Sequence, residues 1–186
     1  NYNLSTEIKK KFNSIDVIYA ANTLTHIANL REVFRSICNI LSNDGVLIIE
    51  DPSLLECVKK SSYDQFYNEH IYLFSAISVK NLLKEFNFEI FDINNLKTHG
   101  GSLRYFIKRK INKDIKISSS VKKQIQKELI FGLDKFSTYK SFSKKVKGSK
   151  KLLLEILKKL NHNNAKVIGY GATAKATTIL NYCKID

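Results

Sequence analysis

The chain has 186 residues, of which 44% are hydrophobic and 11% aromatic, so it can bury a core and is not a disordered segment. All of its apolar runs are far shorter than the roughly 20 residues that a membrane-spanning helix needs. The net charge of +14 comes from 31 Lys and Arg against 17 Asp and Glu. The basic residues are mostly lysines spread along predicted helix faces, and this spread disfavours a nucleic-acid partner. The positive charge fits a small, anionic, nucleotide-bearing substrate equally well.

The cysteines and the amino-terminus bear on location. Cys38, Cys57 and Cys183 are isolated and lack the spacing of metal ligands. An odd, scattered set of cysteines is typical of the reducing cytoplasm, where each thiol serves as a small buried side chain. Residues 1–5 have neither an initiator Met nor the layout of a signal peptide. The sequence therefore predicts a cytoplasmic protein that begins like the middle of a chain.

The first predicted unit is a strand, a helix and a second strand. Residues 15–20 form a short apolar run of β-forming residues, as in a strand buried on both faces. Asn29 can cap the following helix, and the Asn-Asp-Gly turn at residues 43–45 is expected to end it. Residues 46–50 are the next apolar strand, terminated by an Asp-Pro pair. A short helical crossover between two such strands implies parallel pairing.

A helix and a hairpin follow. Ser75 precedes a predicted helix at residues 78–86, and residues 88–93 and 102–108 alternate as strands do. The linker at residues 94–101 is too short for a crossover helix, so this pair is expected to be antiparallel. The fold class is therefore α/β, with the order of the C-terminal half of a doubly wound, Rossmann-like sheet.

The pattern changes after this sheet. Ser118 can cap a long basic helix with Leu129 and Phe136 among its inward positions and a break or bend at Gly148. Beyond it, residues 166–171 are predicted as a strand that leads through a glycine turn into a helix. The three expected regions are the sheet domain at residues 1–111, a helical linker at 112–164 and the start of a second α/β domain at 165–186.

A cluster of polar side chains within an aromatic stretch is the first candidate site. Tyr67, Glu69 and His70 bring a phenol, a carboxylate and an imidazole within four residues, among aromatic neighbours that shift acid and base strengths. His26 follows the first strand, at the edge where open sheets bind ligands. The alternatives are a loop with ordinary surface groups, a core tyrosine and a structural histidine.

Two glycine-containing motifs are weaker candidates. His99 precedes a Gly-Gly pair whose simplest use is a tight turn, and Arg104 on the next strand is either solvated or able to reach a diphosphate. Gly169-Tyr170-Gly171 before a helix can cradle a phosphate, with Lys175 adding charge, or can serve only as a packing turn. This last motif lacks the third glycine of a dinucleotide fingerprint, which disfavours an NAD site.

In their order and spacing these motifs resemble the sugar C-methyltransferases of deoxysugar pathways, which are class I S-adenosylmethionine-dependent enzymes. The resemblance is carried by Tyr67-Asn68-Glu69-His70, by Thr98 to Arg104 and by the segment from Gly169 to Cys183. It covers nearly the whole chain. It implies that a zinc-binding module and the glycine-rich cofactor loop lie before Asn1, so that the chain is an internal fragment that binds no metal itself.

The resemblance also implies a reaction and a set of roles. A methyl group passes from S-adenosylmethionine to a carbon of a nucleotide-linked keto-sugar through an enolate, and a general base contributes roughly 10²–10⁴-fold. His70 is the favoured base, Glu69 orients neighbouring groups, and Tyr67 and His26 can donate hydrogen bonds to the enolate oxygen. The expected contacts are Ala21 and Asn22 for the cofactor, and His99, Arg104, Lys175 and Asn181 for the substrate.

Two other functions remain open on the sequence. The same scaffold can methylate oxygen or nitrogen on another small acceptor. Alternatively, the chain is an inactive, truncated product or a basic binding module.

Overall fold

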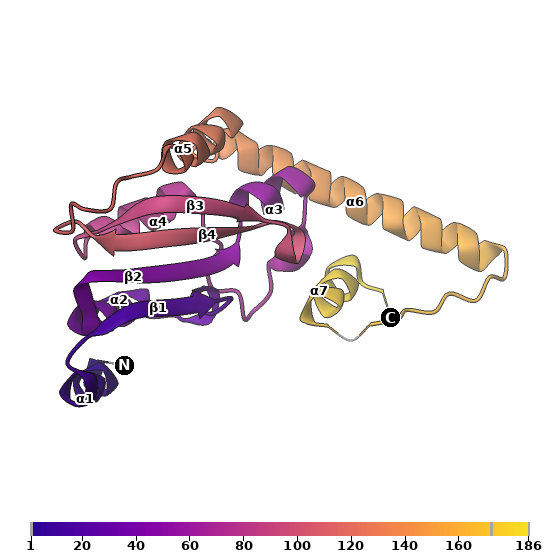
Figure 1. Ribbon diagram of the computed structural model, residues 1–186. Helices are drawn as coiled ribbons and strands as arrows, with labels where there is room; N and C mark the ends of the chain where they lie inside the picture. Colours follow the sequence, from indigo (N-terminus) through magenta and orange to yellow (C-terminus); the bar gives the residue numbers. More distant parts are fainter. Residues whose placement is uncertain (1, 172, 186) are drawn as a thin grey trace.

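A four-stranded mixed sheet lies at the centre of the protein. The computed structural model describes residues 2–171 and 173–185. Ala172, in the segment from Gly169 to Cys183, and the end residues 1 and 186 of the first and last expected regions lie outside the described residues. The strand order is β1-β2-β4-β3 (Figure 1), and the strands are β1 (Ile15–Ala21), β2 (Leu41–Pro52), β3 (Phe88–Leu96) and β4 (Ser102–Arg109). β1 and β2 are parallel, whereas β4 is antiparallel to both β2 and β3. The predicted α/β class, parallel pair and antiparallel hairpin are confirmed.

Helices connect and flank these strands. They are α1 (Tyr2–Phe12), α2 (Leu30–Ile40), α3 (Leu54–Lys60), α4 (Ala76–Lys84), α5 (Ser119–Phe131), α6 (Phe136–His162) and α7 (Ala174–Cys183), with short 3-10 turns η1 (Leu24–His26), η2 (Tyr63–Gln65) and η3 (Thr98–Gly100). The sequence reasoning missed α1 and α3. A signal for α3 was present, because Ser53 lies three residues before Glu56 and its side chain accepts a hydrogen bond from the Glu56 amide.

The core lies on one face of the sheet. α2 presents Leu30, Phe34 and Ile37 to it at helical spacing, and α4 and α5 pack beside them. Glu128 of α5 is fully buried and accepts the backbone amides of Ala76 and Ile77 at 2.8 and 3.0 Å, so α5 caps the start of α4. On the opposite face of β1, Val17 and Tyr19 are each more than half exposed.

The turn expected at residues 43–45 does not form, which corrects the prediction. α2 ends at Ile40 and β2 begins at the next residue, whose backbone is already extended. Ile15 pairs with Leu41 but Val17 pairs with Val46, so the Asn-Asp-Gly segment is an irregularity within β2 rather than the end of a helix. The Asp-Pro pair likewise lies inside β2, which extends to residue 52.

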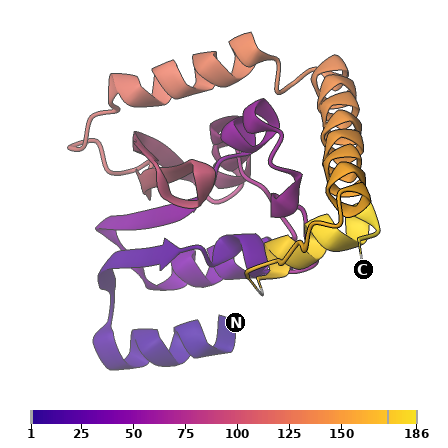
Figure 2. The same ribbon diagram turned by 90° about the vertical axis from the view of Figure 1, so that its right-hand side faces the viewer.

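The long basic helix breaks at Gly132 and not at Gly148. Gly132 has a φ of +84°, and its amide donates to the carbonyls of Glu128 and Leu129 to end α5. Gly148 lies inside the uninterrupted α6. The chain therefore changes direction between α5 and α6 (Figure 2). As a result Leu129 is 44% exposed and Phe136 is 73% exposed, so the prediction that both face inward is wrong.

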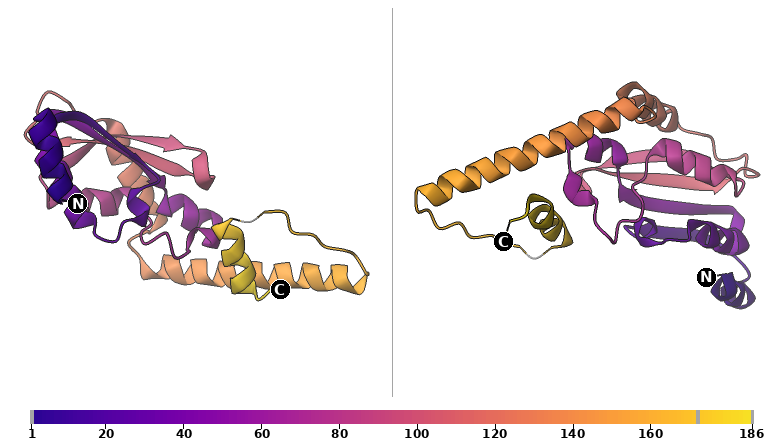
Figure 3. Two further views of the ribbon diagram at one scale, coloured as in Figure 1. Left: turned by 90° about the horizontal axis from the view of Figure 1, so that it is seen from below. Right: turned by 180° about the vertical axis from the view of Figure 1, so that it is seen from behind.

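The strand predicted at residues 166–171 is also absent. A strand needs a neighbour to satisfy its backbone amides and carbonyls, and the described residues place none beside this segment. Ile168 and Tyr170 consequently project into solvent. The helix after it forms as expected, with Thr173 as its cap. α6 reaches beyond the sheet (Figure 3). α7 packs against η2 and also contacts α6.

Candidate functional site

The candidate site begins where β1 ends. Asn22 follows Ala21 with a φ of +49°, a left-handed conformation that asparagine tolerates better than most residues. Its amide donates to the Glu50 carbonyl at 2.7 Å, which ties this bend to β2. The chain then enters η1, so Asn22 and His26 both lie at the carboxyl edge of the parallel strands.

Thr25 joins the segment that carries His26 to the one that carries His70. Its carbonyl accepts the amides of Ile71 and Tyr72 at 2.9 and 3.3 Å, and its hydroxyl donates to the Tyr72 carbonyl. These bonds bring together two stretches that are more than 40 residues apart in the sequence. The two histidine rings then meet edge to face, with centroids 5.1 Å apart.

Hydrogen bonds define the protonation of His70. Its Nδ1 lies 2.9 Å from the Gln65 carbonyl, which can only accept, so Nδ1 carries a proton. Its Nε2 lies 2.8 Å from the Tyr67 hydroxyl, and the two rings lie against each other with centroids 4.1 Å apart. In the neutral imidazole, Nε2 is therefore the acceptor and the Tyr67 hydroxyl is the donor.

The electrostatic surroundings favour neutral forms of both partners. Burial lowers the pKa of His70 below its ordinary value, and the charges of His26 and Lys175 add to this, against the Gln65 carbonyl and the charge of Glu69. Burial also raises the pKa of the Tyr67 hydroxyl, with the Glu69 charge contributing in the same direction. The pair therefore rests as a neutral imidazole and a protonated phenol.

His26 differs from His70 in the nitrogen that remains free. Its Nδ1 lies 2.8 Å from the Glu69 carbonyl and must donate to it, which leaves Nε2 as an acceptor in the neutral ring. Glu69 thus holds His26 through its backbone, while its carboxylate is exposed. Tyr67, Glu69, His70 and His26 lie together, as the sequence suggested; their roles stay predictions.

Gln65 connects the segment from Thr98 to Arg104 to this cluster and was missed by the sequence reasoning. Its carbonyl accepts from His70, and its side-chain amide donates to the His99 carbonyl at 3.2 Å. His99 is exposed, with a left-handed backbone, in the turn before Gly100 and Gly101. No sequence signal distinguishes Gln65 from an ordinary surface glutamine, although the structure buries it.

Arg104 lies on β4, opposite Glu50 of β2. Its guanidinium donates through two nitrogens to one Glu50 oxygen, at 3.0 and 2.7 Å, and the Tyr19 hydroxyl donates to the same oxygen at 3.2 Å. The side chain is thus engaged with Glu50, and its predicted contact with a diphosphate would have to compete with this ion pair.

α7 approaches the site through η2. The rings of Tyr63 and Tyr182 lie 5.3 Å apart, and the Tyr63 hydroxyl is 3.7 Å from the buried Cys183 thiol. This docking brings Lys175 close enough to lower the pKa of His70. Asn181 is on the same helix but is exposed to solvent. Of the two substrate contacts expected on α7, Lys175 is the one whose charge acts on His70.

A buried acid at the end of β2 was also missed. Asp51 is 1% exposed, and neither carboxylate oxygen has a hydrogen-bond partner among the described residues. Burial raises its pKa from 3.8 to about 7, with the Glu50 charge adding to this; the nearby Thr25 amide opposes the shift without forming a well-aligned hydrogen bond. The buried Tyr105 hydroxyl likewise has no hydrogen-bond partner among the described residues, and burial raises its pKa, with the charges of Glu128 and Asp51 adding to this.

Metal and membrane features can be stated for the described residues. Within 2–171 and 173–185, no group of three or more His, Cys, Asp or Glu side chains is arranged to hold a metal ion. Among the same residues, no helix is both long and apolar enough to cross a membrane.

Two family models divide this chain between them. A methyltransferase domain matches residues 2–93, and a C-methyltransferase C-terminal domain matches residues 97–186. The chain thus joins a methyltransferase domain to a C-methyltransferase C-terminal domain. The two matches meet at the end of β3, between residues 93 and 97, whereas the expected boundary at residue 111 follows β4. The division into three regions stays a prediction.

A curated relative is similar to both parts of the chain. The C-methyltransferase NovU of Streptomyces niveus is 25% identical to this chain over 177 residues. The alignment covers 95% of this chain and 42% of the relative, so the chain spans less than half the length of the curated protein that it matches.

Proposed function

We propose that the protein containing this chain transfers a methyl group from S-adenosylmethionine to a carbon beside the ketone of a nucleotide-linked deoxysugar. The cluster in which Tyr67 is hydrogen-bonded to His70, and His70 meets the His26 ring, carries this proposal. It joins an acceptor nitrogen to a hydroxyl donor at the carboxyl edge of a methyltransferase-domain sheet, which is what the formation of an enolate requires.

The proton is taken by His70 in the proposed reaction. The Nε2 lone pair accepts the proton from the carbon next to the ketone, and the electron pair of the broken C–H bond becomes the enolate. Once Nε2 is protonated it no longer accepts from Tyr67, so the Tyr67 hydroxyl is free to donate to the enolate oxygen. The 2.8 Å contact thus couples removal of the proton to stabilisation of the charge.

His26 has a more restricted role in this scheme. Its Nδ1 proton is committed to the Glu69 carbonyl, so it can donate to the enolate oxygen only as an imidazolium. In the neutral form its free Nε2 can accept from a sugar hydroxyl. Glu69 fixes the His26 ring through its backbone and presents its exposed carboxylate to a second hydroxyl.

The carboxyl edge of β1 fits one side of the cofactor. Asn22 leaves the strand in a left-handed conformation, and its side-chain amide is exposed. Ala21 before it adds little bulk, so this bend can lie against a planar or hydroxylated ligand. S-adenosylmethionine supplies, when bound, an electrophilic methyl group for the enolate carbon. Zinc has no fitting group of ligands among the described residues and enters no step.

The substrate and the surrounding domains belong to the same proposal. Lys175 pairs with the diphosphate of the nucleotide-linked sugar, and His99, Arg104 and Asn181 line the remaining contacts. The four strands are the C-terminal half of a class I methyltransferase sheet, and α7 belongs to a second α/β domain. Support comes from the strand order and from the charge that Lys175 exerts on His70.

The test uses the full-length protein with a 4-keto-deoxysugar nucleotide in D₂O. Without cofactor, the enolate route predicts exchange of the substrate proton beside the ketone for deuterium, and His70→Ala should slow both this exchange and methyl transfer by about 10²–10⁴-fold. Wild-type exchange at the blank rate, with methyl found on oxygen or nitrogen, would favour the alternative acceptors. Undiminished exchange in His70→Ala would remove His70 as the base.

A further inference from the structure

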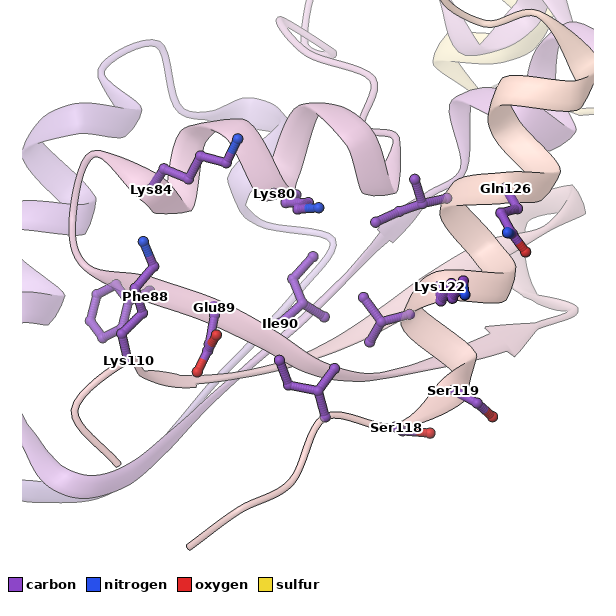
Figure 4. A pocket seen from close by; sticks show the side chains of 13 residues that line it. Lys80, Lys84, Phe88, Glu89, Ile90, Lys110, Ser118, Ser119, Lys122 and Gln126 are labelled. Carbon is purple, nitrogen blue, oxygen red and sulfur yellow. The ribbon is translucent and has the colours of Figure 1, made fainter. Parts of the chain in front are cut away.

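A cavity of about 640 Å³ lies between α4, the beginning of β3 and the first half of α5 (Figure 4). β3 is parallel to β1 and β2, because β2 and β3 are both antiparallel to β4. The beginning of β3 is therefore at the edge of the sheet opposite the one that carries His26. The cavity is separate from the histidine site, and its volume is within the range of small-molecule pockets.

The floor of this cavity is apolar. Phe88 and Ile90 of β3 and Val121 of α5 are buried beneath it, and Ile125 extends the same surface. Ile117, at the rim, is 55% exposed although its side chain is as large and apolar as those of the core. An apolar body that entered the cavity would cover the exposed Ile117 and the half-buried Ile125 and remove their side chains from water.

The lining carries an excess of positive charge. Four lysines from α4, from the segment after β4 and from α5 contribute to it: Lys80, Lys84, Lys110 and Lys122. None of the four forms an ion pair with a described residue. The one acid in the lining, Glu89, is paired at 2.9 Å with Lys108, which is itself 2% exposed. The four charges thus remain uncompensated by the protein.

The walls are held in place before any ligand arrives. The Ser118 amide donates to the Phe91 carbonyl at 2.7 Å, and the Ile93 amide donates to the Ser120 hydroxyl at 3.1 Å. These bonds fasten the start of α5 to β3. The hydroxyls of Ser118 and Ser119 lie beside the cavity with Lys122 (Figure 4). A preformed pocket loses little ordering entropy when it binds a ligand.

We propose that this cavity binds a small amphiphilic anion, with a phosphate or carboxylate head joined to an apolar or aromatic body. The body covers the floor of Phe88, Ile90 and Val121, while the head pairs with the lysines above it. A neutral ligand would leave the four positive charges unpaired. A bare ion would leave the apolar side chains of Ile117 and Ile125 in contact with water. Only the combination uses both parts of the lining.

The experiment is calorimetric titration of the full-length protein with hexyl phosphate. We expect binding that weakens with added salt, and binding of hexan-1-ol and of inorganic phosphate that is weaker by about tenfold or more. Replacing two pocket lysines, in Lys80→Gln/Lys122→Gln, should lower the affinity by a similar factor. Ile125→Trp, which fills the cavity, should abolish binding.

The controls separate this site from the general basic surface. Lys144→Gln/Lys147→Gln removes the same charge from the exposed side of α6 and should leave the affinity unchanged. Because Lys80 and Lys122 are exposed, their replacement spares the fold even if Ile125→Trp destabilises it. Equal loss in both lysine pairs, equal binding of hexan-1-ol, or displacement by S-adenosylmethionine or the sugar nucleotide would overturn the proposal.

Discussion

The lone pairs of the two histidines differ at the scale of single residues. The His70 Nε2 is occupied by the Tyr67 hydroxyl, whereas the His26 Nε2 has no hydrogen-bond partner among the described residues. In the proposed reaction the Tyr67 hydroxyl donates to the enolate oxygen. Tyr67→Phe should lower kcat by about 10²–10³-fold, because it removes this donor to the negative charge that develops on the oxygen. KM should change less. Steady-state methyl transfer measures both, with Tyr2→Phe in α1 as the matched control; an unchanged kcat would exclude Tyr67 as the donor.

Asp51 gives a prediction about stability and pH. Its folded pKa of about 7 exceeds its ordinary value of 3.8 because of burial, so the folded state holds a proton that the unfolded state releases between these values. The stability contributed by this proton is complete below pH 3.8 and is lost as the pH rises to about 7. Asp51→Asn should therefore raise Tm at pH 8 and have little effect near pH 4.

The measurement is thermal unfolding of wild type and variant across this pH range. The difference between the two proteins isolates Asp51 from His70, whose lowered pKa acts with the opposite sign. The stabilisation at pH 8 is expected to be on the order of a few kcal/mol. Asp44→Asn, at an exposed position, should produce no such difference. A Tm gap that does not widen with pH would show that Asp51 has an ordinary pKa.

The members of the histidine cluster could be predicted from the sequence, but its geometry could not. Residue types and spacing indicate Tyr67, Glu69, His70 and His26. The contacts that orient them run through backbone carbonyls of Gln65, Glu69 and Thr25. Every residue type has a backbone carbonyl, so the sequence does not indicate which carbonyl will accept these hydrogen bonds.

Two glycines have opposite expected effects at the scale of the helices. Gly132 ends α5 with a φ of +84°, and a Cβ there would lie 2.9 Å from the Thr138 hydroxyl, so Gly132→Ala should destabilise the protein by about 1–2 kcal/mol. Gly148 lies within α6 with open space around it, so Gly148→Ala should stabilise by roughly 0.5–1 kcal/mol. Denaturant unfolding measures both, and effects of equal sign would contradict this division of roles.

The helices also show where patterns of spacing fail. Apolar periodicity indicated α2 and α5, because each packs apolar side chains against the core. Periodicity did not locate the break between α5 and α6, since the sequence does not distinguish Gly132 from Gly148 and the two differ in backbone conformation. The segment at 166–171 reads as a strand, but a strand also needs a partner, which no local pattern supplies.

The docking of α7 on η2 couples distant parts of the whole molecule. Lys175 helps to lower the pKa of His70, so Lys175→Gln should raise that pKa and move the acid limb of the kcat/KM profile to higher pH. KM for the sugar nucleotide should rise more than kcat falls, because a positive charge for the diphosphate is lost. The control is Lys184→Gln, just beyond α7 and exposed. An unshifted acid limb would separate α7 from the histidines.

The place of β4 in the sheet has a consequence for biosynthesis. Of these four strands β4 is the last to leave the ribosome, yet it lies between β2 and β3 and pairs with both. Until residue 109 has emerged, β2 has one unpaired edge and β3 has two, and such edges favour contact with other nascent chains. Synthesis that pauses within the β3–β4 turn would prolong this exposure. We therefore expect chaperone engagement of the nascent chain to fall when β4 closes the sheet.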